Sequence, residues 1–117
     1  MQRIIFNLCS RLVYSTIYHM RNRARSIDDR KVGLPDGSVL EIHVWQLPAA
    51  TAERPHGIKY RLQYCLPDGT TLIRYDNKRG KGDHKHIREQ EFPYRFTTKE
   101  QLLKDFQADV IKHGGKL

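Results

Sequence analysis

Two histidines determine which chemistry this sequence is equipped to do. His84 and His86 lie two residues apart, at the end of a stretch from Arg74 that is otherwise rich in cations and glycine. If the backbone there is extended, both imidazoles point to the same side. Two imidazoles that titrate near neutrality are suited to metal-free RNA cleavage, in which one withdraws the 2′-hydroxyl proton and the other protonates the leaving 5′-oxygen.

The residues around this pair could bind RNA and shape the backbone. Cations would stabilise the charge that grows on a scissile phosphate, aromatic rings would stack on bases, and glycines would let N–H groups approach phosphate oxygens. The candidate phosphate-binding residues are Arg74, Lys78, Arg79, Lys81, Lys85 and Arg95; the candidate stacking residues are Tyr75 and Tyr94; the residues that shape or orient the segment are Asp76, Asn77, Gly80 and Gly82. Because unpaired charges are costly to bury, the stretch is predicted to be a surface loop.

Blander interpretations of these residues stay open. A basic loop with glycines is also typical of a solvated hairpin tip, and Asp76 would pair with Arg74 or His84 without any catalytic role. An HxH pair with Asp76 or Asp83 as a third ligand would bind a metal. The surrounding cations oppose a further cation, so we predict no metal and no cofactor. His19, His43, His56 and His113 are interpreted as structural.

Composition limits the partners. The chain has 117 residues, enough for one domain, and 21 Lys+Arg against 13 Asp+Glu give a net charge of +8. Such a bias favours an anionic partner, such as nucleic acid or an acidic protein; a basic protein without a polyanionic partner is the alternative. No segment approaches the roughly 18 apolar residues of a membrane span, so no membrane association is predicted and a cytoplasmic location is expected.

The first 25 residues differ from the rest. Apolar residues recur there at three- and four-residue steps, which predicts a helix: Ile4, Ile5, Leu8, Leu12, Val13 and Ile17. Three interpretations are open: a basic amphipathic helix at a membrane surface, a helix packed on the domain, or an extension that precedes a translation start at Met20. We therefore divide the chain into an N-terminal extension, 1–25, and a domain, 26–117.

The domain is predicted to be α+β. Alternating apolar and polar residues predict strands over 38–47, 58–66 and 70–75, and shorter extended segments over 26–32 and 92–96. Pro-Asp-Gly turns precede the first and third of the three longer strands, which favours antiparallel pairing. A helix is predicted over 99–113, with Thr97 and Glu100 as a capping box and Gly114-Gly115 as its end. The expected architecture is an antiparallel sheet of three to five strands with this helix packed on one face.

Three strings of residues together resemble the TumE family of small toxins. They are Arg-Tyr-Asp-Asn-Lys-Arg-Gly-Lys-Gly-Asp-His-Lys-His, then Phe-Pro-Tyr-Arg-Phe, then Thr-Lys-Glu-Gln-Leu-Leu-Lys-Asp-Phe-Gln-Ala-Asp-Val. The predicted strand with the sequence Leu-Glu-Ile-x-Val-Trp-x-Leu-Pro also resembles that family. The resemblance covers about residues 26–110. It implies the toxin of a type II toxin–antitoxin pair, neutralised by a helix-turn-helix antitoxin. By analogy, we expect endoribonuclease cleavage, with ribosome-associated RNA as one target; a non-enzymatic basic module that binds nucleic acid or a partner is the alternative.

Overall fold

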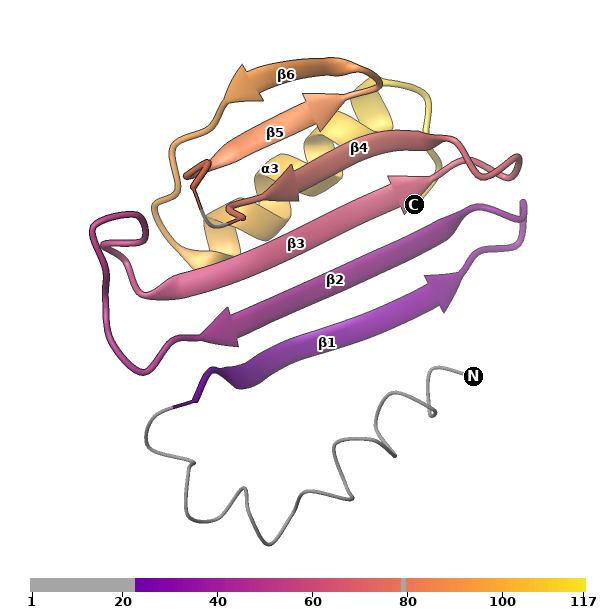
Figure 1. Cartoon of the computed structure of the whole chain (residues 1–117). Helices are drawn as coiled ribbons and strands as arrows, with labels where there is room; N and C mark the ends of the chain where they lie inside the picture. Colours follow the sequence, from indigo (N-terminus) through magenta and orange to yellow (C-terminus); the bar gives the residue numbers. More distant parts are fainter. Residues whose placement is uncertain (1–22, 79) are drawn as a thin grey trace, which may run out of the picture.

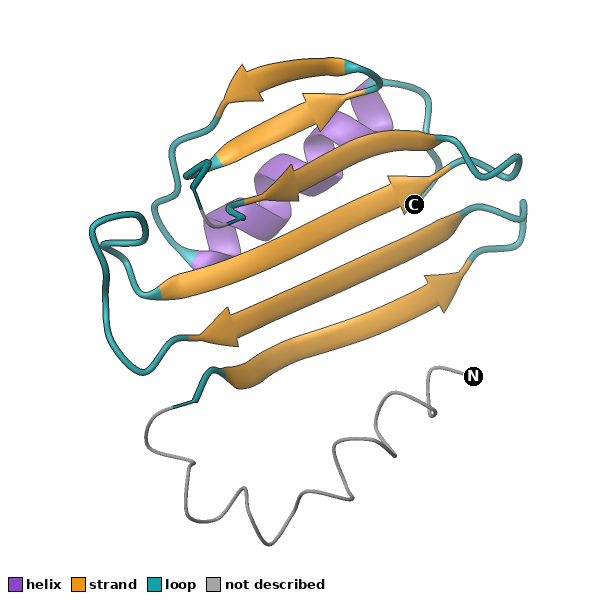
Figure 2. Cartoon of the chain, in the orientation of Figure 1, coloured by secondary structure: helices purple, strands orange, loops and turns teal. Residues whose placement is uncertain are grey.

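The computed structural model describes residues 23–78 and 80–117, which form one antiparallel sheet and one helix. The strands are β1 (Arg25–Gly33), β2 (Val39–Gln46), β3 (Ile58–Cys65), β4 (Thr71–Asp76), β5 (His84–Ile87) and β6 (Gln90–Pro93), followed by the helix α3 (Lys99–Lys112). The six strands lie in the sheet in chain order, so each pairs with its neighbour in sequence. Figures 1 and 2 show this meander with α3 behind β3, β4 and β5. The α+β class and the packing of the helix on one face are confirmed.

Two Pro-Asp-Gly turns build the first half of the meander. Gly37 and Gly69 have φ of 92° and 91°, a left-handed conformation that glycine adopts without steric strain. The preceding carboxylates complete the turns, since Asp36 accepts from the Ser38 backbone N–H and Asp68 accepts from the Thr70 backbone N–H. These turns join β1 to β2 and β3 to β4.

Alternation along the strands gives the sheet an apolar face toward α3. Leu62 lies opposite both Ile42 and Tyr75 in the register, so successive strands direct their apolar residues to the same side. Leu102, Phe106 and Val110 form the buried stripe of the helix. The resulting core consists of Ile42, Val44, Tyr60, Leu62, Tyr64, Leu72, Ile73, Tyr75, Leu102, Phe106 and Val110.

The expected number of strands was wrong, because the sheet has six rather than three to five. The strand that was not predicted is β5, which reads His-Lys-His-Ile; β6, also of four residues, overlaps the extended segment predicted over 92–96. Such short polar segments lack the alternating apolar pattern of a half-buried strand. Their turn also lacks glycine, and Arg88 takes the positive φ of 55° instead.

The helix begins at Lys99 as predicted and ends one residue before the predicted end, and its N-cap differs from the prediction. Thr98, not Thr97, is the N-cap, and its hydroxyl accepts from the Gln101 backbone N–H at 3.0 Å. The helix ends before Gly114, whose φ is 99°. The helix predicted within 1–25 lies almost entirely outside the described residues, and the division of the chain at 25/26 stays a prediction. Within residues 23–78 and 80–117, no helix is long and apolar enough to cross a membrane.

Candidate acid–base site

The face of the sheet opposite α3 carries polar side chains, and we call it the polar face. Antiparallel pairing aligns its residues across the last three strands, with Asp76 opposite His84 and with His86 opposite both Arg74 and Glu91. Directly paired side chains on one face are close enough to interact. The register therefore gathers two imidazoles, two carboxylates and one guanidinium on the polar face.

His84 is held by acceptors on both sides of its ring. Its Nε2 lies 2.7 Å from Asp76 Oδ1, and its Nδ1 lies 3.0 Å from the carbonyl oxygen of Gly82. Only 5% of the residue is exposed. Oxygen atoms therefore lie close to both ring nitrogens of this largely buried histidine.

His86 lies beside it in a different environment. The two ring centroids are 5.0 Å apart, with an angle of 78° between the ring planes. Its Nε2 is buried and has no hydrogen-bond partner among the described residues. Burial lowers the pKa of His86, and the Arg74 guanidinium lowers it further. His86 is therefore neutral at pH 7 and has a lone pair to offer.

Arg74 and Asp76 complete the cluster on β4. Arg74 Nε lies 3.2 Å from Asp76 Oδ2, so this carboxylate stands between a guanidinium and the ring of His84. Asp76 is thus close to both neighbours, and the orienting role predicted for it stays a prediction. The arrangement places two imidazoles, a carboxylate and a guanidinium on one face, and these are kinds of group that phosphodiester cleavage can use.

The turn between β4 and β5 is more buried than the sequence predicted. Asn77 is 1% exposed; its side chain accepts from the Tyr60 backbone N–H at 3.0 Å and donates to the Ile58 carbonyl at 2.8 Å. Its own carbonyl accepts two hydrogen bonds from the buried Arg54 guanidinium. The prediction that Arg74 to His86 is one surface loop was wrong, because its two ends are paired strands and Asn77 extends the hydrogen bonding of β3 beyond the end of β4.

The remaining turn residues are nearer the surface. Lys78, Gly80 and Lys81 are exposed. Gly80 and Gly82 have φ of 83° and 69°, so the turn needs glycine at both positions. The Gly80 backbone N–H donates to Glu53 Oε2 at 2.9 Å. Arg79 lies outside the described residues, and Arg95 is exposed in the segment that leads to α3.

Three predicted site residues lie on the α3 side of the sheet. Lys85 Nζ is 2.9 Å from Asp109 Oδ2 of the helix. Tyr75 is fully buried and its hydroxyl also donates to Asp109, while the Tyr94 hydroxyl donates to Asp105 at 2.6 Å. Burial, followed by the hydrogen bond to Asp109, raises the pKa of Tyr75. These residues attach the sheet to the helix and are separated from the histidine pair by the sheet itself.

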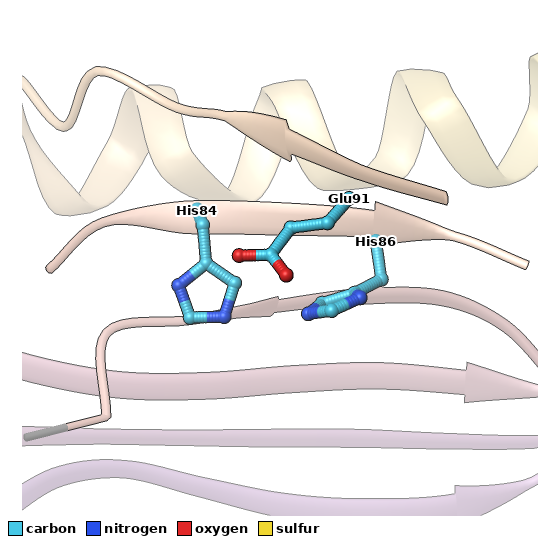
Figure 3. A group of neighbouring side chains, drawn as sticks. All are labelled: His84, His86 and Glu91. Atoms are coloured by element: carbon cyan, nitrogen blue, oxygen red, sulfur yellow. The ribbon is translucent and has the colours of Figure 1, made fainter. Parts of the chain in front are cut away.

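Sequence reasoning overlooked Glu91. Its carboxylate and one nitrogen from each of His84 and His86 all lie within 4.8 Å of one another (Figure 3). The signal was present, since a glutamate lies five residues after His86 on a segment that could fold back as a hairpin. It was hidden because the β5–β6 turn has no glycine, proline or asparagine. Asp83, considered as a metal ligand, instead accepts from the Tyr60 hydroxyl at 2.7 Å.

A small, strongly basic α+β domain with an acid–base cluster on one sheet face is the class that these features define. The family model described as Toxin TumE matches residues 2–113. The chain therefore belongs to the TumE toxin family, which implies a toxin of a toxin–antitoxin system and an antitoxin as partner. The match extends beyond the span of the resemblance noted in the sequence, because it also includes most of residues 1–25. No curated protein and no solved structure matches the chain.

Proposed function

We propose that this toxin cleaves RNA as a metal-independent endoribonuclease of a type II toxin–antitoxin system, with His84 and His86 transferring protons. The observation that carries the proposal is the pair of imidazoles on one face, 5.0 Å apart, beside Asp76 and Arg74. Family membership supplies the toxin role, and the geometry supports the choice of reaction.

The proposed reaction needs no oxidant, metal or added water in its first step. His86 accepts the proton of a 2′-hydroxyl, whose oxygen then forms a bond to the adjacent phosphorus. The bond from phosphorus to the 5′-oxygen breaks, and that oxygen takes the proton held by His84. The products are a 2′,3′-cyclic phosphate and a 5′-hydroxyl end. Arg74 stabilises the charge that develops on the phosphate oxygens.

The rest of the polar face supports an RNA ligand. On β3, the exposed Lys59 and Arg61 continue the line of cations from Arg74. Lys78 and Lys81 add positive charge at the exposed end of the β4–β5 turn. In this proposal the RNA backbone crosses the strands toward the histidine pair. The substrate is ribosome-associated RNA in the cytoplasm. A helix-turn-helix antitoxin neutralises the toxin by blocking this face.

Cleavage of a labelled RNA by purified protein in EDTA tests the proposal. We expect His84→Ala and His86→Ala each to lower the rate by about 100- to 10,000-fold, the usual contribution of a general acid or base. His113→Ala is the matched control, because His113 caps α3 and is not part of the cluster. Circular dichroism confirms that each variant is folded. Growth arrest by a folded double variant, or cleavage that requires added metal, would refute the assignment.

The low exposure of His84 favours a second candidate. A residue that is 5% exposed has little surface to offer a substrate, so the cluster could serve a non-enzymatic module that binds nucleic acid or an acidic partner. Such a module would bind RNA with steep salt dependence, since cations release counterions from the phosphates. It would yield no cleaved products at any salt concentration, which separates it from the nuclease.

A further inference from the structure

Three potential metal ligands converge on the polar face. His84 and His86 come from β5 and Glu91 from β6, and their nearest ligand atoms lie within 4.8 Å of one another. In Figure 3 the Glu91 carboxylate projects toward the space between the two rings. Antiparallel pairing of His86 with Glu91, together with the two-residue spacing of the histidines, makes this convergence a property of the hairpin backbone.

Both rings are prepared for a ligand. His84 Nδ1 lies 3.0 Å from the Gly82 carbonyl, to which it can donate, so Nε2 faces the cluster and a metal there would take the place of the Nε2 proton; a contact of this kind on the other ring nitrogen is usual for a metal-binding histidine. His86 Nε2 is buried without a hydrogen-bond partner among the described residues. A buried ring nitrogen without a partner is unfavourable unless something binds it.

The local charges permit a cation. Glu91 supplies one carboxylate and Asp76, 2.7 Å from His84 Nε2, supplies another, whereas Arg74 is the one guanidinium in contact with this group in the described part of the chain. The sequence suggested that cations would dominate here, but Lys85 lies on the other side of the sheet against Asp109. Lys85 therefore does not oppose a metal at this site, and Arg74 is the cation that is paired with Asp76 beside it.

The ligand set selects the class of metal. Two imidazoles and one carboxylate are the donors of open zinc sites, whereas magnesium and calcium prefer oxygen ligands alone. Tetrahedral bonds of about 2.0 to 2.1 Å place ligand atoms about 3.3 Å apart. Side-chain rotation must close the present spread of up to 4.8 Å to this value, and Glu91 is exposed on the edge strand β6.

We propose that His84, His86 and Glu91 bind one divalent cation of the zinc class, and that the bound cation switches off the histidine pair. A metal bound to His86 occupies the lone pair that would accept the proton of the 2′-hydroxyl. A metal bound to His84 takes the place of the proton that would be given to the 5′-oxygen. The switching half of this proposal rests on the proposed function. The binding half depends only on the geometry of the cluster.

Titration of the whole chain with Zn²⁺ by calorimetry, and with Co²⁺ by visible absorption, tests the binding half. We expect one tight site and the absorption of four- or five-coordinate Co²⁺. Glu91→Gln, an isosteric change at an exposed position, and His86→Ala should each weaken binding more than about tenfold. Glu89→Gln, two residues away in the exposed turn, is the matched control and should bind as the natural chain does.

The outcomes separate the two halves. Equal affinity in Glu91→Gln and Glu89→Gln, or no binding by the natural chain, would overturn the site, while EDTA-resistant RNA cleavage would still stand. If the site binds, Zn²⁺ should inhibit cleavage, and the concentration that halves the rate should rise more than about tenfold in Glu91→Gln. A bound metal that leaves the rate unchanged or raises it would overturn the switch and leave the site in place.

Discussion

Replacing Asp109 should separate β5, the strand that carries both histidines, from the helix that supports it. Asp109 Oδ2 accepts hydrogen bonds from the Tyr75 hydroxyl of β4 and from Lys85 Nζ of β5, the latter at 2.9 Å. Asparagine has nearly the same shape and keeps an acceptor for Tyr75. It removes the charge opposite Lys85, whose side chain is only 25% exposed. The substitution therefore tests one charge-assisted contact with little change in packing.

The magnitude follows from the charge on that contact. A hydrogen bond between charged groups contributes about 1.5 to 3 kcal/mol, so we expect Asp109→Asn to lower the free energy of unfolding by about 2 kcal/mol. For a domain of about 100 residues this corresponds to a fall in Tm of about 8 to 16 °C. Thermal unfolding at pH 7, followed by circular dichroism, measures it. Glu89→Gln, which neutralises an exposed carboxylate, is the control.

The effect should disappear in acid. Burial opposes the charge on Asp109, but the hydrogen bonds from Tyr75 and Lys85 outweigh it and hold the pKa below the ordinary value of 3.8. A carboxylate with a lowered folded pKa stabilises the protein above its unfolded pKa and loses that contribution as the pH falls through the folded pKa. The natural chain and the variant should therefore converge in stability as the pH falls below 3.8. Equal stability at pH 7, or a difference that persists unchanged in strong acid, would refute this account.

Three further substitutions test other parts of the fold and the site. Asn77→Ala leaves the Tyr60 N–H and the Ile58 carbonyl without partners, so urea unfolding should show a loss of about 2 to 4 kcal/mol; a loss below about 0.5 kcal/mol would mean that water replaces the amide. Thr98→Ala removes the N-cap of α3 and should cost about 1 kcal/mol, whereas Thr97→Ala, its neighbour, should leave the urea midpoint unchanged. Asp76→Asn withdraws the carboxylate from His84 and Arg74 and should lower the rate of RNA cleavage about 100-fold; an unchanged rate would show that Asp76 orients neither group.

The alternation of apolar and polar residues, together with the residues of the turns, was enough to predict the strands that are long and half-buried. Tyr60, Leu62 and Tyr64 recur with period two along β3, and the Pro-Asp-Gly turns contain the left-handed glycines that such turns require. The helix was predicted to within one residue because its apolar stripe is complete. Two adjacent threonines offer equivalent caps, so the pattern alone could not decide between Thr97 and Thr98.

The candidate site was only half predictable. Strand spacing gave His84 and His86 as a pair, because a period of two needs no tertiary information. Glu91 depends on the register of a hairpin whose turn residue, Arg88, adopts a positive φ that glycine or asparagine would usually mark. The polar composition of the segment from Arg74 to His86 also predicted exposure to solvent. Asn77 is buried instead, because its side chain forms hydrogen bonds with the backbone of β3. Local polarity cannot reveal that kind of burial.

The order of the meander sets the order in which its strands can pair during synthesis. β1 to β3 can pair as they leave the ribosome, since each strand needs only the one before it. The histidine hairpin and α3 come last, and the nascent sheet has no apolar cover until Lys99–Lys112 is complete. An unfinished chain thus lacks the helix that packs against β4 and pairs with Lys85 of β5, so the proposed site on β5 would be complete only near the end of translation.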